Sequence, residues 1–136
     1  MEPATTPVLD PDTIAGLQRA QADLGDRLLI RQLVEIYRTN APRRIEQLRK
    51  AIAGSDAKTL GFVAHTLKTN CAMLGATAMA AMCATLERFG DAAVLEQRGE
   101  KATFEDAAAL FAGLELEFER VLAALAQLLE GEPTNT

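Results

Sequence analysis

The feature of this chain that most constrains its fold is a long stretch without proline. The prolines lie at positions 3, 7, 11, 42 and 133, so residues 43 to 132 contain none. Apolar residues recur there at spacings of three and four, which is the period of an amphipathic helix. Because proline interrupts helices, and because alanine, leucine and glutamate are abundant, we predict an all-α protein.

Capping residues and glycines divide the chain into expected helices. The first begins in the segment LDPDT, with Asp10 as its cap and Pro11 as its first helical residue, and ends near residues 20–26. The second runs from about Asp26 to Ala53. Its apolar residues keep their phase across Pro42, so we expect one kinked helix rather than two.

Three further helices are expected. The third follows Gly54, with Ser55 or Asp56 as its cap, and ends at Gly75. The fourth starts near Thr77 and frays near Gly90, before a polar connection over residues 91–102. The fifth starts near Thr103, which is its expected cap. The predicted buried residues are Leu29, Leu33, Ile36, Tyr37, Ile45, Leu48 and Ile52, then Leu60, Val63, Ala64, Leu67, Cys71 and Leu74, then Met79, Cys83 and Leu86, and finally Ala107, Phe111, Leu114, Phe118, Val121, Leu125 and Leu128.

These helices predict an antiparallel up-and-down four-helix bundle with a short extra N-terminal helix. We expect the bundle to span residues 9–130, and residues 1–8 and 131–136 to be disordered ends with little to bury. A bundle alone does not identify a function, since the architecture hosts many.

Composition excludes several classes of function. A net charge of −5 and a pI near 4.9 argue against a nucleic-acid-binding protein, which needs a basic surface. The chain has no long apolar run and no signal peptide, so we expect a cytoplasmic protein without a membrane role. In that compartment Cys71 and Cys83 are expected to be reduced core thiols rather than a disulfide or a metal site.

The chain contains one histidine, His65. On a helical wheel it lies roughly 150° from the centre of the apolar stripe of the third helix, so it is expected to face water. Lys68 follows one turn later on the same side. The other residues around His65 are Gly61, Phe62, Thr69, Ala72 and Met73, which are small or apolar where charges are usual. Together they predict a docking surface, although Phe62 and Met73 are also compatible with packing at the edge of the core.

An exposed neutral imidazole is a nucleophile that can accept a phosphoryl group, and a nearby ammonium offsets the charge of the product. The chain contains neither a GxxxxGK[ST] loop nor a GxGxxG segment to hold a nucleotide. A phosphoryl group for His65 is therefore expected to come from another protein.

The segment AHTLKTNCAMLGATAMAAMCATLE, residues 64–87, resembles the histidine-containing phosphotransfer (HPt) domains of bacterial two-component phosphorelays. The matching residues are Ala64, His65, Leu67, Lys68, Leu74, Gly75, Ala76, Cys83, Leu86 and Glu87, with Met79 in place of the usual leucine. Their intervals match without a gap, and the helices on either side extend the resemblance to about residues 10–130.

The resemblance implies a phosphoryl carrier without catalytic activity of its own. His65 would accept a phosphoryl group through Nε2 from the aspartate of a response-regulator receiver domain and pass it to another receiver, and Lys68 would stabilise its charge. The chain would have no cofactor, since the receiver supplies Mg²⁺. Its partners would be receiver domains, a hybrid sensor histidine kinase, or both. We expect a monomer, because a relay protein needs its His65 face open, although the long last helix would also support a dimer. Beginning at Met1 favours a free-standing protein.

One residue departs from the family pattern. The family usually has glycine one turn after the histidine, where this chain has Thr69. Its side chain has three possible effects. It would narrow access to the imidazole, it would hydrogen-bond the ring or a phosphoryl oxygen, or it would be small enough to have no effect on docking. We expect it to be tolerated.

Two other readings are open. The dimerisation helices of a sensor kinase also present a histidine on a bundle, but an acidic residue typically follows it, whereas Thr66 follows His65. Alternatively, the chain is an unphosphorylated scaffold or inhibitor that binds a receiver or a kinase. Retention of Lys68 beside an exposed histidine argues against this second reading.

Overall fold

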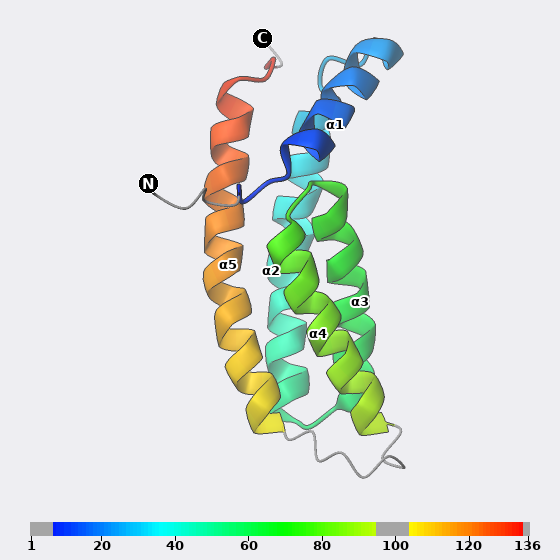
Figure 1. Ribbon diagram of the computed structural model, residues 1–136, viewed down its shortest axis with the longest axis vertical. Helices are drawn as coiled ribbons and strands as arrows, with labels where there is room; N and C mark the ends of the chain where they lie inside the picture. The colour runs from blue at the N-terminus through cyan, green and yellow to red at the C-terminus, as the bar shows by residue number, and fades with distance from the viewer. Residues whose placement is uncertain (1–6, 95–103, 135–136) are drawn as a thin grey trace, which may run out of the picture.

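The computed structural model describes residues 7–94 and 104–134, and all regular structure in these ranges is helical. The helices are α1 (Pro11–Leu24), α2 (Leu29–Ala53), α3 (Ala57–Met73), α4 (Thr77–Val94) and α5 (Phe104–Glu130). Helices α2 to α5 form an antiparallel bundle in which α3 and α5 each pack against both α2 and α4 (Figure 1). Helix α1 packs on α2 at one end of the bundle. The predicted all-α bundle with an extra N-terminal helix is confirmed.

Local sequence signals set the ends of these helices. The carboxylate of Asp10 accepts from the backbone N–H of Thr13 at 3.3 Å, and Asp56 caps α3 by accepting from Thr59 N–H at 3.1 Å. Gly75 ends α3 in the left-handed region, with φ of 78°. As predicted, α2 continues through Pro42.

The buried faces of α3 and α4 match the prediction, whereas those of α2 and α5 differ in part. In α2 the buried residues near the N-terminus are Ile30 and Val34, while Leu29 and Leu33 are only half-buried and Ile36 is 58% exposed. At the end of α5, Leu129 is buried rather than Leu128. In both places apolar residues are adjacent in sequence, so periodicity does not decide which of them faces the core.

The predicted fraying of α4 near Gly90 was wrong, because the helix continues to Val94. Gly90 lies where α4 crosses α3, and a Cβ atom there would be 2.7 Å from Gly61 N and 2.8 Å from Ala57 O. Glycine is needed at this position because the backbones of the two helices are in contact. The same crossing buries Gly61.

Described residues beyond both ends of the bundle, which the sequence predicts to be disordered, make contacts with the rest of the structure. Val8 packs against the core. Arg31 donates to the carbonyls of Leu129 and Pro133, at 3.1 and 2.9 Å, and Arg27 donates to Thr134 O at 2.7 Å. These arginines satisfy carbonyls at and beyond the end of α5, so residues 131–134 lie against α2. Residues 1–6 and 135–136, most of the expected connection and the predicted cap Thr103 lie outside the described ranges.

Two glycine substitutions test the crossing of α3 and α4. Gly90→Ala is expected to lower the free energy of unfolding by about 1–3 kcal/mol, because its methyl group overlaps backbone atoms. Gly113→Ala in α5 is the control: a Cβ there meets nothing within 4 Å, so it should stabilise the protein by about 0.5–1 kcal/mol. Urea unfolding followed by circular dichroism measures both. If Gly90→Ala and Gly113→Ala changed the free energy of unfolding equally, the close contact of α4 with α3 at Gly90 would be contradicted.

Candidate functional site

His65 lies on the outer side of α3 and contacts a carboxylate of α4. Its side chain is 63% exposed, as the helical wheel predicts. Its Nδ1 atom is 2.9 Å from Glu87 Oε2 and 3.2 Å from Glu87 Oε1. The contact joins residues 22 positions apart in sequence, so it depends on the packing of α3 against α4.

Lys68 binds the same carboxylate from one turn further along α3. Its Nζ atom donates to Glu87 Oε2 at 2.9 Å and to Oε1 at 3.0 Å. The hydrogen bond from Lys68, followed by that from His65, lowers the pKa of Glu87, although partial burial opposes this effect. Glu87 is therefore an ionised group at neutral pH, held between an imidazole and an ammonium.

This arrangement determines which nitrogen of His65 carries the proton. A carboxylate accepts but does not donate, so neutral His65 places its N–H at Nδ1 and its lone pair at Nε2. Within the described residues Nε2 has no hydrogen-bond partner, and the exposed ring leaves it accessible. The site thus presents a fixed, unprotonated nitrogen to solvent.

Glu87 is the site residue that the sequence analysis did not single out. It appeared there only as one match in the family pattern, and its contact with His65 arises from tertiary packing. Lys68 was expected to act on a phosphoryl group, but in this structure it binds Glu87. A phosphoryl group on Nε2 would thus be close to a Lys68–Glu87 ion pair rather than to an unpaired ammonium.

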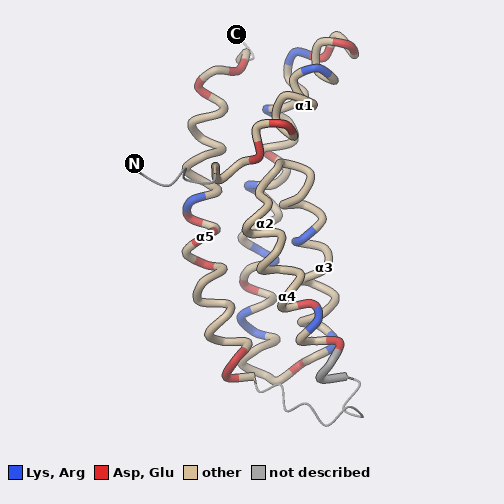
Figure 2. The backbone as a smooth tube through the Cα atoms, viewed as in Figure 1, with Lys and Arg blue, Asp and Glu red and all other residues tan. Residues whose placement is uncertain are grey.

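Four of the five predicted docking residues are exposed. Phe62 is 73% and Met73 50% exposed, and Thr69 and Ala72 are exposed as well, so Phe62 and Met73 do not belong to the core. Gly61 was wrongly assigned to this surface, because the crossing with α4 covers it. Helix α3 carries only two charged residues, Lys58 and Lys68, and most of its tube is tan, the colour of uncharged residues, in Figure 2.

Thr69 directs its hydroxyl away from the imidazole. Its Oγ1 atom donates to the backbone carbonyl of His65 at 3.2 Å, which is a local bond within α3. Of the alternatives considered for Thr69, a hydrogen bond to the ring is therefore not formed in this structure. Thr69 remains a small exposed residue one turn from His65.

The described part of the chain also bears on metal binding, on the two thiols and on membrane-spanning helices. No group of three or more histidine, cysteine or acidic residues is arranged there to hold a metal ion. Cys71 and Cys83 are buried and free, as predicted. None of the described helices combines the length and the apolar character needed to cross a membrane.

Comparisons with a family model and with solved structures each give a match. The family model of the Hpt domain matches residues 32–131. Among solved structures, the chain is similar to histidine-containing phosphotransfer protein B (HptB) from Pseudomonas aeruginosa PAO1, with a TM-score of 0.76 and 26% sequence identity over 95% of this chain and 100% of that one. A comparison with curated proteins finds no match. Because the family model covers most of the sequence, the chain belongs to the Hpt domain family.

Proposed function

We propose that this protein accepts a phosphoryl group on His65 from the phosphoaspartate of a receiver domain and relays it to the aspartate of another receiver. As a histidine phosphotransfer protein it is a phosphocarrier rather than an enzyme. The observation that carries the proposal is the exposed His65 ring, whose Nδ1 is bound to Glu87 and whose Nε2 has no hydrogen-bond partner among the described residues.

In the proposed reaction the lone pair of Nε2 attacks phosphorus. The P–Nε2 bond forms as the P–O bond to the partner's aspartate breaks, and the aspartate carboxylate leaves. Nδ1 keeps its proton, so the imidazole becomes positively charged, and the carboxylate of Glu87 stabilises that charge. The reverse reaction, with a second receiver, regenerates neutral His65.

The charge on the transferred group explains why Lys68 accompanies Glu87. An isolated carboxylate beside His65 would repel an incoming phosphoryl group. Lys68 cancels that negative charge, while Glu87 still holds the proton at Nδ1. Lys68 thereby contributes to phosphoryl stabilisation through Glu87.

The remaining requirements fall to the partner in this proposal. Phosphoryl transfer depends on positioning and on neutralisation of charge by a metal ion, and we assign the Mg²⁺ to the receiver domain. Phe62, Thr69, Ala72 and Met73 form the exposed surface around His65 on which the receiver docks. We expect the protein to act in the cytoplasm as a monomer whose His65 face is open.

His65→Gln tests the phosphoacceptor directly. The parent, incubated with Mg²⁺ and receivers labelled on aspartate, should gain acid-labile, base-stable label, and the variant should gain none, since no other histidine is present. Matching circular dichroism spectra would show that both chains are folded. Equal labelling of parent and variant would contradict the assignment.

Glu87→Ala tests the orientation of the ring. Loss of the acceptor at Nδ1 is expected to slow phosphoryl uptake about tenfold or more, the usual effect of removing a residue that orients a histidine. Glu87→Gln retains one acceptor oxygen without the charge, so its rate should lie between those of Glu87→Ala and the parent. Single-turnover rates at saturating receiver measure this. A parental rate for Glu87→Ala would exclude a role for the carboxylate.

Lys68→Ala tests the compensation of charge. Without Lys68 the full charge of Glu87 faces the incoming phosphoryl group, so transfer is expected to slow about tenfold. Lys58→Ala is the matched control, since Lys58 lies on the same helix, is exposed and has no contact with the site. The same loss of rate in both variants would mean that general charge, rather than the contact with Glu87, is responsible.

A further inference from the structure

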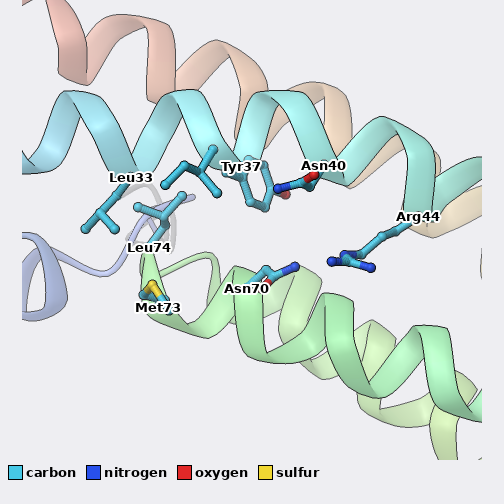
Figure 3. Close-up of a pocket in the computed structure, with 8 residues that line it drawn as sticks. Leu33, Tyr37, Asn40, Arg44, Asn70, Met73 and Leu74 are labelled. Carbon is cyan, nitrogen blue, oxygen red and sulfur yellow. The ribbon is translucent and has the colours of Figure 1, made fainter.

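A groove between α2 and α3 lies beside the proposed docking surface around His65. The groove has a volume of about 100 Å³. Leu33, Ile36, Met73 and Leu74 supply its apolar wall, and Asn40, Asn70 and Arg44 its polar end (Figure 3). Small-molecule sites usually measure about 300–1,000 Å³, so this groove fits the end of a protein side chain better than a metabolite.

Arg44 makes no hydrogen bond or ion pair with the described residues. Its Nε atom is buried and lacks an acceptor, which is rare for a buried donor. In Figure 3 its side chain and that of Asn70 extend toward each other across the groove. No acidic residue lines the groove, so the charge of the guanidinium has no counterion there.

The groove is continuous with the proposed docking surface. Met73 belongs to both, and Asn70 follows Thr69 directly in α3. Ile36, which the sequence placed in the core, is instead 58% exposed at the groove. A protein that covers His65, Thr69 and Met73 therefore also meets the apolar wall and Arg44.

We propose that Arg44 is a specificity-determining residue that binds an aspartate or glutamate side chain of the docked receiver, while an adjoining apolar side chain of that receiver contacts Ile36 and Met73. Guanidinium and carboxylate form paired, charge-assisted hydrogen bonds, and a partly desolvated site strengthens them. The inference rests on the proposed function, because the receiver is the partner that brings this carboxylate. Receivers lacking an acidic residue at the contact are then disfavoured, because they leave Arg44 unpaired.

Charge reversal tests the proposal, with a matched control in the adjacent residue. Arg44→Glu and Arg44→Gln are compared with Arg43→Glu, which changes the net charge equally but lies at an exposed position outside the groove. The probes are purified receiver domains encoded in the same genome, phosphorylated on aspartate, with Mg²⁺. We expect Arg44→Glu to raise the KM for the preferred receiver about tenfold or more and Arg44→Gln to raise it less, with kcat unchanged for both. Arg43→Glu should change KM less than about threefold.

Restoration of a low KM for Arg44→Glu by an Asp→Lys or Glu→Lys substitution on the receiver would identify the paired carboxylate. Equal KM values for Arg44→Glu and Arg43→Glu would overturn the proposal. Sedimentation of the parent and of Arg44→Glu is a further test. If the parent formed a concentration-dependent dimer that Arg44→Glu abolished, the proposal would be overturned, because the groove would then bind a second copy of this chain.

The same variants separate this proposal from the proposed function. If the parent accepts no label from any receiver, the relay is wrong, and binding of unphosphorylated receivers then tests the groove by itself. Weaker binding by Arg44→Glu than by Arg43→Glu supports the groove, and equal binding rejects it. If the parent is labelled but Arg44→Glu behaves like the parent, only the role of Arg44 fails.

Discussion

The carboxylate of Glu87 is the interaction on which the proposed chemistry depends. Placed between His65 and Lys68, it holds one proton at Nδ1 and has its own charge balanced by an ammonium. Neither Glu87 nor Lys68 alone would both orient the imidazole and leave the site free of net negative charge. Lysine without the carboxylate would not orient the ring, and the carboxylate without lysine would repel a phosphoryl group. The three side chains therefore act as one unit in our account.

The bundle serves this unit by bringing α3 and α4 into close contact. Gly90 lies three residues, or about one turn, after Glu87 and touches the backbone of α3 at Gly61. A larger residue at that crossing would separate the helices at the level where Glu87 must reach His65 and Lys68. Gly90 and Glu87 thus lie on consecutive turns of α4, and both contact α3.

Much of this arrangement was predictable from local patterns. In α3 the apolar residues from Leu60 to Leu74 recur mainly at spacings of three and four, so periodicity placed the buried face correctly and His65 on the opposite side. It left open whether the adjacent Phe62 and Met73 pack at the edge of the core. In α2, adjacent apolar residues made the pattern ambiguous, and Ile36 was assigned to the core although it borders the groove with Arg44. Neither the burial of Gly61 nor the contact of His65 with Glu87 was predictable by periodicity, because both depend on how α4 crosses α3.

The central claim is that Glu87 holds the neutral His65 ring with its proton on Nδ1 and leaves Nε2 as the nucleophile. Nitrogen-15 NMR of the labelled imidazole, at a pH where the ring is neutral, measures this tautomer directly. Our account predicts a protonated Nδ1 and an unprotonated Nε2 in the parent, and loss of that preference in Glu87→Ala. A parent whose neutral ring carries its proton mainly on Nε2 would contradict the account.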